Sequence, residues 1–268
     1  MPKVAIIGGT GVYDARMLEN VTKAVVDTPY GTAWVATGGY QGLEVAFVAR
    51  HGAGHSVPPH LVNYRANIYA LSSMGVERII ATAAVGSLRQ EMKPGHFVIV
   101  DQFLDFTRSR PSTFYEGGER GVIHCDVTVP YCEEVGALLV DTARQMGIPV
   151  HAGGTYVCTE GPRFETAAEI RMFAQLGGDV VGMTSVPECV LAREMGMCYA
   201  TVAMVTNYAA GISPTKLTHT EVIDIMAANV ANLRRILMGA VGAVSASRGC
   251  GCADILEEIA RLRGQETD

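Results

Sequence analysis

Short hydrophobic runs that end in glycine or polar residues recur along the chain, and each is long enough for one buried strand. The runs are Lys3 to Ile7, Val45–Ala49, Ile79–Ala84, Phe97–Val100, Val180–Met183 and Cys198–Val205. Between several of them, apolar residues recur at three- and four-residue spacing, which is typical of amphipathic helices. These helical segments are Val62–Met74, Cys132–Met146, Thr166–Leu176 and Pro187–Met195. Strands that alternate with helices predict an α/β fold with a largely parallel, covered sheet.

Towards the C-terminus, the pattern predicts a long closing helix over Glu221–Val244 and a separate amphipathic helix over Asp254–Arg263. The sequence shows no repeat and no internal linker. We therefore expect one domain over residues 1–268, with 245–268 as a C-terminal extension that carries a Cys-Gly-Cys segment and a helix. Residues 107–122 are rich in Arg, Ser, Pro and Gly and lack periodicity. We predict a long functional loop there, which could reach a neighbouring subunit.

Composition excludes several classes of protein. With 268 residues, 49% of them hydrophobic and 18% charged, the chain can bury a large core in one domain. Its net charge of −6 and pI near 5.7 give no cationic field, and Arg108-Ser109-Arg110 is too short to follow a phosphate backbone, which argues against a nucleic acid partner. No apolar run approaches the ~20 residues that span a bilayer, and the first residues form a strand pattern instead of a signal peptide. We expect a cytoplasmic protein with no membrane partner.

The cysteines number seven, and most are scattered through apolar stretches: Cys125, Cys132, Cys158, Cys189 and Cys198. An odd, scattered set favours reduced thiols, most of them packed in the core, over a secreted disulfide framework. The other two form Cys250-Gly251-Cys252 in a small, glycine-containing segment. That pair has two open interpretations, a redox or disulfide role and an incidental pair of exposed thiols.

Candidate chemistry gathers in the turns after the predicted strands, where ligands of open α/β sheets bind. Gly8-Gly9-Thr10-Gly11 could hold a phosphate on backbone N–H groups and a hydroxyl, or could be a tight turn without a ligand. Asp14 stands where a dinucleotide-binding fingerprint would need its third glycine. Arg50-His51-Gly52 supplies two potential cations for an oxyanion, the alternative being a solvated surface turn.

Two further turns, Ala83–Ser87 and Met183–Glu188, could add backbone N–H donors and a second hydroxyl. Each turn alone has an ordinary structural explanation. Four such turns together favour a shared anion site.

This combination resembles the family of trimeric purine nucleoside phosphorylases and methylthioadenosine phosphorylases, from about Val4 to about Leu237. The segments that carry the resemblance are Gly8-Gly9-Thr10-Gly11, Arg50-His51-Gly52, Val62-Asn63-Tyr64-Arg65-Ala66-Asn67, Gly86-Ser87-Leu88, Asp101-Gln102-Phe103, Glu160-Gly161-Pro162-Arg163-Phe164 and Met183-Thr184-Ser185-Val186-Pro187-Glu188. Several of them, notably the segment with Asn63, look closest to the methylthioadenosine branch. The resemblance implies a single α/β domain with a mixed central sheet flanked by helices, assembled as a homotrimer or a dimer of trimers.

The resemblance also implies a phosphate site, with the ribose against Met183. The implied phosphate residues are Thr10, Arg50, His51, Ala83, Ala84 and Thr184. Ala83 departs from the methylthioadenosine phosphorylases, which have threonine there, so a side-chain hydroxyl to phosphate could be missing.

The base pocket departs from that branch more strongly, because its two base-reading aspartates fall at Asn207 and Ala209, on either side of Tyr208. An amide can donate to a 6-oxo oxygen and accept from N7–H, so Asn207 favours hypoxanthine or guanine. Glu165 replaces a serine of that branch and resembles the glutamate with which oxopurine enzymes accept N1–H. The alternatives are a carboxylate at a helix N-terminus for Glu165 and a turn-forming role for Asn207.

Three more residues complete the implied substrate site. Phe164 is expected to pack on the base, or else in the core. His219 resembles the histidine with which oxopurine phosphorylases bond a 5′-hydroxyl, and is otherwise an ordinary residue in the loop before a helix. His124 matches a position that the family contributes across the subunit interface.

We therefore expect a 6-oxopurine nucleoside phosphorylase, a pentosyltransferase that converts inosine or guanosine and phosphate into free base and ribose 1-phosphate in purine salvage. The candidate catalytic residues are Asn207, Glu165 and His51. Phosphate is a co-substrate, and no metal or organic cofactor is implied. Neither a Gly-x-Ser-x-Gly nor a His-Glu-x-x-His motif occurs, which argues against a serine hydrolase and a zinc enzyme.

Other functions stay open. The alternative within the family is an S-methyl-5′-thioinosine phosphorylase, and a methylthioadenosine phosphorylase fits the pocket less well. From other classes, a nicotinamide-binding reductase would explain the first glycine turn, and a non-catalytic nucleoside sensor would share the pocket.

Overall fold

The computed structural model describes residues 1–9, 12, 17–52, 54, 56–212 and 219–265, without the side chains at 219, 221, 222 and 263–265. Its sheet contains β1 (Val4–Gly8), β2 (Glu19–Thr28), β3 (Gly31–Tyr40), β4 (Leu43–Ala49), β5 (Arg78–Ser87), β6 (Phe97–Ile99), β7 (Gln102–Phe106), β8 (Val150–Ala152), β9 (Thr155–Thr159), β10 (Val180–Gly182) and β11 (Cys198–Tyr208). The helices are α1 (Tyr64–Ser73), α2 (Glu133–Gln145), α3 (Ala167–Gln175), α4 (Ser185–Glu194), α5 (His219–Ala243) and α6 (Ile255–Gln265), with short 3₁₀ turns η3 (Pro59–Leu61), η4 (Gly118–Arg120) and η5 (Gly251–Ala253).

The centre of the sheet is β5, and its two edges are paired differently. β11 runs parallel to one edge from Arg78 to Ser87. On the other edge β1 pairs only as far as Ala81, and β10 pairs from Gly86 onwards. Among the described strands none lies beside residues 82–85 on that edge. This interruption, the sheet window, opens the middle of the sheet to a ligand.

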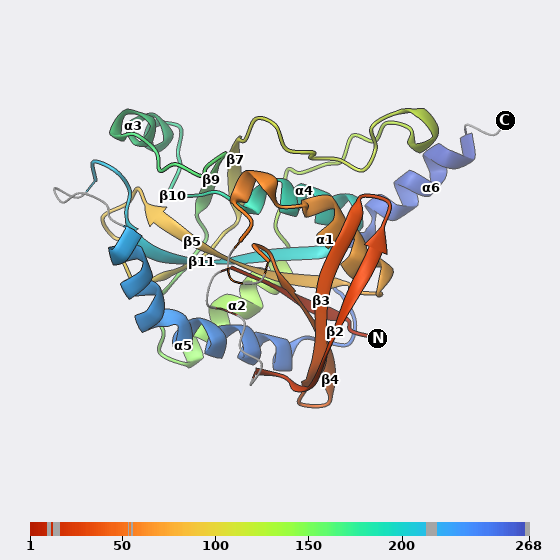
Figure 1. The fold of residues 1–268 in the computed structure, drawn as a ribbon, viewed down its shortest axis with the longest axis horizontal. Helices are drawn as coiled ribbons and strands as arrows, with labels where there is room; N and C mark the ends of the chain where they lie inside the picture. Colours follow the sequence, from red (N-terminus) through yellow and green to blue (C-terminus); the bar gives the residue numbers. More distant parts are fainter. Residues whose placement is uncertain (10–11, 13–16, 53, 55, 213–218, 266–268) are drawn as a thin grey trace.

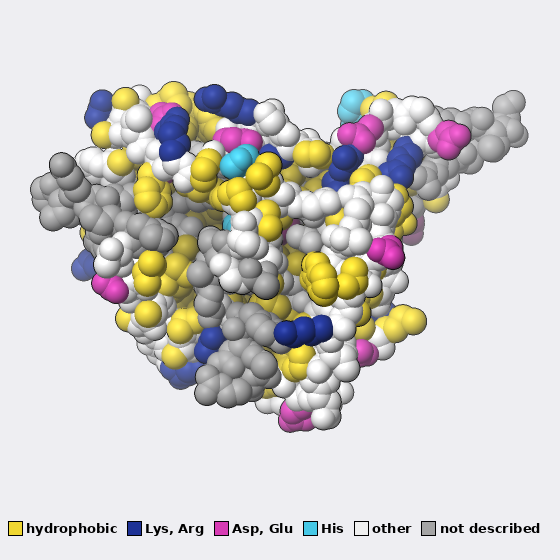
Figure 2. Space-filling view, viewed as in Figure 1, with side chains coloured by type: hydrophobic (Ala, Val, Ile, Leu, Met, Phe, Trp, Pro, Cys, Tyr) yellow, Lys and Arg dark blue, Asp and Glu magenta, His cyan; other side chains and the backbone are white. Residues whose placement is uncertain are grey.

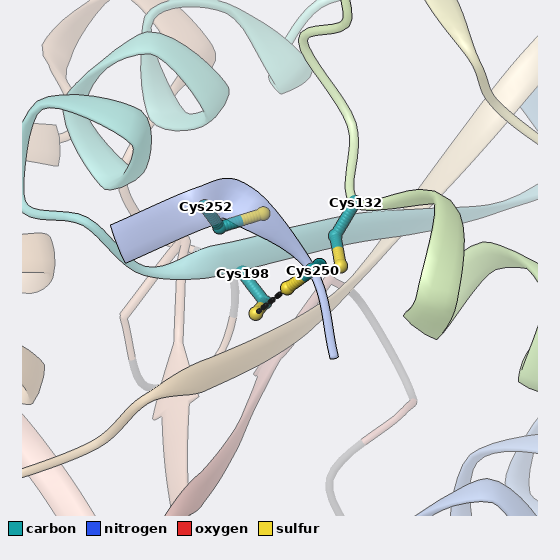
Figure 3. A group of neighbouring side chains, drawn as sticks. All are labelled: Cys132, Cys198, Cys250 and Cys252. Atoms are coloured by element: carbon teal, nitrogen blue, oxygen red, sulfur yellow. Dashed lines mark hydrogen bonds between the residues drawn. The ribbon is translucent and has the colours of Figure 1, made fainter. Parts of the chain in front are cut away.

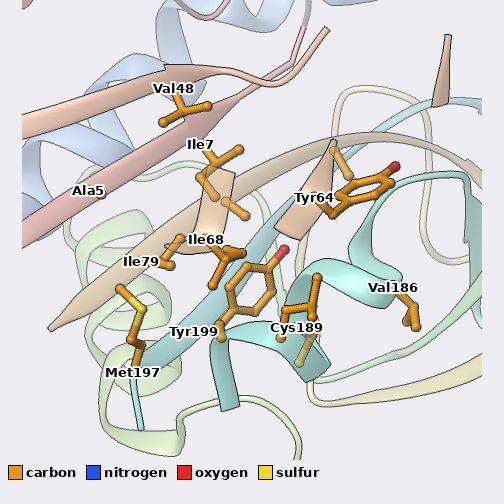
Figure 4. Packing of buried hydrophobic residues seen from close by; sticks show 14 of the residues in the cluster. Ala5, Ile7, Val48, Tyr64, Ile68, Ile79, Val186, Cys189, Met197 and Tyr199 are labelled. Atoms are coloured by element: carbon orange, nitrogen blue, oxygen red, sulfur yellow. The ribbon is translucent and has the colours of Figure 1, made fainter. Parts of the chain in front are cut away.

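Helices cover the sheet on two faces, with α1 and α4 on one and α2 and α5 on the other (Figure 1). In the first layer, Ile68 of α1 packs with Ile7 of β1 and Tyr199 of β11 (Figure 4). In the second layer, Leu139 of α2 and Ile236 of α5 bury the opposite face. Both faces of the central strands are therefore apolar, which explains why their sequences read as continuous hydrophobic runs.

The structure confirms the α/β fold with a mixed sheet, and each predicted strand and helix has a counterpart, with ends shifted by a few residues. The largely parallel sheet expected from the pattern is confirmed for its centre, where β5 runs parallel to β1 and β11, but not for the whole sheet. β2, β3 and β4 form an antiparallel meander, and β10 runs antiparallel to β5 and β6 to β11. The hydrophobic pattern missed β2, whose side chains are mostly exposed. It also missed β3 and the short strands β7, β8 and β9.

The surface agrees with the composition. On the face shown in Figure 2, acidic and basic side chains are intermixed and form no extended field of one sign. Residues 107–122 form the predicted long loop, interrupted only by η4. Within the described residues, no helix has the length and apolar character needed to cross a membrane.

Candidate active site

The sheet window forms the floor of a cavity of about 720 Å³. Residues 82–86 of β5 line it, together with the ends of β4, β10 and β11 and the loop after β9. The cavity brings together most of the residues expected from the sequence: Arg50, His51, Ala83, Ala84, Phe164, Glu165, Met183, Thr184, Asn207 and Ala209. Thr10 lies outside the described residues.

Arg50 follows β4 and is the principal cation of the cavity. Its Nε and Nη2 donate to the two carboxylate oxygens of Glu188, at 2.9 and 2.6 Å, and its Nη1 donates to Thr82 O at 2.7 Å. Arg50 is 3% exposed and Glu188 0%. Burial alone would lower the pKa of Arg50, but the carboxylate of Glu188 outweighs it and raises that pKa. The guanidinium is therefore permanently charged and held in one orientation beside the window.

His51 is oriented by the backbone next to Arg50. Its Nδ1 lies 2.8 Å from Val57 O, and a carbonyl oxygen can only accept, so Nδ1 carries the proton. Nε2 can then donate to an anion only when the ring is an imidazolium. Across the cavity, Thr184 is held by the hydrogen bond from its backbone N–H to the Tyr156 hydroxyl, at 3.2 Å.

Asn207 is aimed into the cavity by an irregularity of β11. Val205 pairs with Val85 and Asn207 with Gly86, so Thr206 is an extra residue that forms a β-bulge. The Thr206 hydroxyl donates to Asn207 Oδ1 at 2.8 Å, and Asn207 Nδ2 donates to Tyr208 O at 2.9 Å. Because a carbonyl can only accept, the amide orientation is fixed. One N–H of Nδ2 and one lone pair of Oδ1 remain for a ligand.

Glu165 enters the cavity from the loop between β9 and α3. Its Oε1 accepts a hydrogen bond from the Thr159 hydroxyl at 2.6 Å. Burial raises the pKa of Glu165, and the Thr159 bond opposes that rise. The loop is braced on the far side, where Thr166 and Glu169 form a capping box at the start of α3 and Arg163 bonds both oxygens of Glu169. Glu165 is thus a constrained acceptor.

The rest of the wall is mainly apolar. Met183 and Phe164 line it, and Phe164 is 44% exposed, so its ring is available to a ligand. Ile223 and Met226 contribute from the first turns of α5. His219 is the first residue of α5, and its side chain lies outside the described part of the chain.

Comparisons with known proteins identify the family. A family model described as the phosphorylase superfamily matches residues 3–242. The chain belongs to the phosphorylase superfamily. A probable 6-oxopurine nucleoside phosphorylase of Moorella thermoacetica is 59% identical over 94% of this chain and 96% of its own length. The 6-oxopurine nucleoside phosphorylase of Pyrococcus furiosus is 57% identical over 96% of this chain and 98% of its own. Among solved structures, methylthioadenosine phosphorylase from Schistosoma mansoni in complex with adenine matches with a TM-score of 0.90 and 34% identity, over 97% of each chain.

Two expected substrate residues of this superfamily member do not line the cavity. Tyr208 turns to the surface, where its hydroxyl donates to Gln90 O at 3.1 Å. His124 lies exposed in the loop segment before α2.

The sequence analysis missed the part that Arg110 plays in this phosphorylase fold. The sequence analysis named Arg110 only as part of a short basic cluster, yet its side chain is buried. Its Nη1 donates to Met183 O at 2.7 Å, and its Nη2 donates to Thr159 O at 3.1 Å and Glu160 O at 2.7 Å. One side chain therefore ties the loop after β9 to the turn after β10. The only sequence signal was an arginine in a loop rich in proline and glycine, which does not distinguish a buried clamp from a surface charge.

Glu188 was also missed, although it lies in one of the segments that carried the family resemblance. It is the partner of Arg50, and its Oε2 also accepts from the Tyr199 hydroxyl at 2.7 Å. A carboxylate beside an anion site gives no sequence signal of its own, because it would be expected to repel the anion.

Proposed function

We propose that this chain is a 6-oxopurine nucleoside phosphorylase, which splits inosine and guanosine with phosphate into a free base and ribose 1-phosphate. The observation that carries the proposal is the fixed amide of Asn207. Its remaining N–H can donate to O6 and its remaining lone pair can accept from N7–H. Both bonds fit a 6-oxopurine, whereas a 6-amino group would leave that N–H facing another donor.

Glu165 supports the same base. Its carboxylate can accept N1–H, which hypoxanthine and guanine carry and adenine lacks. A partly buried acceptor left without a donor is unfavourable, so Glu165 discriminates against adenine. Relatives named 6-oxopurine nucleoside phosphorylase at 59% and 57% identity are consistent with this preference.

In this proposal, phosphate binds beside Arg50, His51, the backbone of Ala83 and Ala84, and Thr184, which line the same cavity. In the reaction, a phosphate oxygen forms a bond to C1′ of the ribose while the bond from C1′ to N9 breaks. The electron pair of that bond moves to the purine, and the proton that N7 takes up balances the one that hydrogen phosphate loses on becoming the sugar phosphate ester. The bound phosphate offsets the positive charge that develops on the sugar, and Asn207 stabilises the negative charge that develops on the base. Arg50 stays charged, with its charge balanced by Glu188, and it contributes N–H donors that direct the phosphate.

A second candidate, S-methyl-5′-thioinosine phosphorolysis, is favoured by one observation. Ile223 and Met226 give the α5 side of the cavity an apolar wall, which would suit a methylthio group. The expected bond from His219 to a 5′-hydroxyl favours inosine and guanosine instead.

The deciding experiment measures base release from inosine, guanosine, adenosine, methylthioinosine and methylthioadenosine, each with and without phosphate. Phosphate-dependent cleavage of inosine and guanosine, with both adenosine compounds inert, is expected. Preference for methylthioinosine would agree with the roles of Glu165 and Asn207 at the base, but it would contradict the bond from His219 to a 5′-hydroxyl. Cleavage of methylthioadenosine in preference to all others would overturn the roles given to Glu165 and Asn207.

The proposal includes a cytoplasmic homotrimer, or a dimer of trimers, in which His124 completes the cavity of a neighbouring subunit. Phosphate is the co-substrate, and the reaction requires no metal or organic cofactor. Subunit complementation tests the assembly. Mixed oligomers of His124→Ala and Asn207→Asp subunits should recover activity, because some cavities then combine an intact His124 with an intact Asn207. Recovery no greater than the sum of the separate variants would contradict a shared cavity.

A further inference from the structure

Four cysteines from distant parts of the sequence meet at one place (Figure 3), and none of them lines the active-site cavity. Their Sγ atoms all lie within 4.8 Å of one another, and the four are Cys132, Cys198, Cys250 and Cys252. Cys250 is half-buried and the other three are buried. The burial of Cys252 contradicts the interpretation of the Cys-Gly-Cys segment as exposed thiols. The proposed phosphorolysis uses none of these thiols.

Two of the cysteines belong to the body of the fold. Cys132 is the N-cap residue of α2, and Cys198 is the first residue of β11. The backbone N–H of Cys132 donates to Tyr199 O at 2.8 Å, which holds the start of α2 against β11. Because both residues lie at the ends of regular elements, the fold itself sets the positions of their sulfurs.

The other two cysteines are brought to this pair by the C-terminal extension. Arg248 Nη1 donates to Gly196 O at 2.8 Å, and the backbone N–H of Gly249 donates to Glu134 Oε2 at 2.6 Å. These bonds fasten the residues just before Cys250 to the turn that precedes β11 and to the first turn of α2. The Cys-Gly-Cys segment then continues into η5 over Cys132 and Cys198 (Figure 3).

The arrangement of the sulfurs is that of a ligand shell. In a tetrahedral site with zinc–sulfur bonds of about 2.3 Å, the sulfurs lie about 3.8 Å from each other. Here the sulfurs of Cys198 and Cys250 are 3.3 Å apart, and no pair exceeds 4.8 Å. Small side-chain adjustments would place all four at bonding distance from one ion.

We propose that Cys132, Cys198, Cys250 and Cys252 bind one Zn²⁺ as thiolates, in a structural site that fastens the C-terminal extension to the body of the fold. Four sulfur ligands select a soft, tetrahedral metal over magnesium or calcium, which prefer oxygen. A four-cysteine shell has no open position for substrate, so the ion would be structural. The compact sulfur cluster suits one ion better than a larger iron–sulfur core.

Metal analysis of the full chain tests the proposal directly. The chain is produced without a metal-binding tag, kept reduced, supplied with Zn²⁺ and freed of loosely bound metal before elemental analysis and intact-mass measurement. One zinc per chain is expected. Protein that holds no zinc, or whose mass shows two disulfides among these cysteines under reducing conditions, would overturn the proposal.

Cobalt reports the ligands themselves. Titration of the metal-free chain with Co²⁺ should give the visible and near-ultraviolet bands of a tetrahedral cobalt thiolate, reaching a plateau at one equivalent. Spectra typical of octahedral oxygen coordination would rule out the four-thiolate shell.

Variants locate the site. The double variant Cys250→Ser, Cys252→Ser should lose both the zinc and the cobalt bands. A chelator should lower the Tm of the unaltered chain but leave the Tm of the double variant unchanged. Cys125→Ser is the matched control, because this half-buried cysteine lies outside the cluster and its loss should leave one zinc per chain. Zinc retained by the double variant would show that the metal binds elsewhere. If the double variant does not fold, the cobalt spectrum of the unaltered chain still decides.

Discussion

At the scale of single residues, the ion pair of Arg50 and Glu188 is the most demanding feature of the cavity, because both charges are almost fully buried. Removing one partner of such a pair leaves the other charge unpaired, which typically destabilises a protein by about 3–5 kcal/mol. We expect Glu188→Ala to lower the free energy of unfolding by roughly that amount in urea titrations. The double variant Arg50→Met, Glu188→Leu should regain much of the stability and remain inactive. If the double variant were as unstable as the single one, unpaired charge would not be the source of the loss.

A second prediction concerns the choice of base. Asn207→Asp replaces the N–H donor by a carboxylate oxygen that faces O6, so kcat/KM for inosine should fall by roughly 10²-fold or more, with a smaller change for adenosine. Steady-state kinetics with both nucleosides measure the ratio. The exposed Asn20 provides the matched control, since Asn20→Asp makes the same chemical change outside the cavity. An unaltered preference for inosine would show that Asn207 does not recognise the base.

A third prediction concerns pH. Burial raises the pKa of Glu165, and only its carboxylate can accept N1–H. The kcat/KM for inosine should therefore fall as the pH drops through that raised pKa. Glu165→Gln should have lower activity and lack this acidic limb of the pH profile. A profile unchanged in shape would argue against a role for the Glu165 carboxylate.

The same raised pKa affects folding. A carboxyl group whose pKa is higher in the folded state favours folding below its unfolded pKa, and this contribution is lost as the pH rises through the folded value. Glu165→Gln removes the buried charge, so its Tm minus that of the unaltered chain should be more positive near neutral pH than in acid, both measured without ligand. Thermal unfolding at both pH values checks the sign.

At the scale of elements, the bulge in β11 and the glycine opposite it act together. A Cβ on Gly86 would lie 3.1 Å from Asn207 Nδ2 and 3.3 Å from Val181 Cγ1, closer than ordinary contacts. We expect Gly86→Ala to displace the amide and to lower kcat/KM for inosine by about tenfold, since small misplacements of a positioning group reduce catalysis strongly. Enzyme kinetics on the purified variant test this.

The control for Gly86→Ala lies in α2. A Cβ on Gly136 would meet only Ile99, at 3.7 Å, which is an ordinary contact. Gly136→Ala should leave kinetics unchanged and add about 0.5–1 kcal/mol of stability through helix propensity. Equal kinetic effects of the two substitutions would show that the Gly86 result is nonspecific.

The elements also show what the sequence could and could not predict. Continuous apolar runs identified the strands buried on both faces, such as β1 and β5, because burial leaves no polar alternation. β2 escaped because its side chains are mostly exposed, and its pairing with β3 comes from contacts that local patterns do not encode. Within the site, Arg50 was found because two potential cations follow a predicted strand, whereas Asn207 was found through the family resemblance. Arg110 was not, since most of its partners are backbone carbonyls of remote loops.

At the scale of the whole molecule, the ligand should stabilise the fold, because the loops that bind it come from most of the chain. A ligand that binds only the folded state adds about 2.7 kcal/mol at a concentration of 100 Kd. We expect phosphate to raise the Tm relative to chloride at equal ionic strength, and Arg50→Met to abolish the difference. An identical rise in that variant would mean that phosphate acts as a general stabilising salt.

The sheet window also affects how readily the protein could aggregate through its strand edges. Strand edges normally invite other chains to add a strand, and proteins protect them with charges, prolines or covering segments. Here the interrupted edge of β5 lies inside a cavity, flanked by β1 and β10, where a small molecule can enter but an extended chain has no straight path. The molecule thus keeps backbone available for recognition in the middle of its sheet without exposing a template for aggregation.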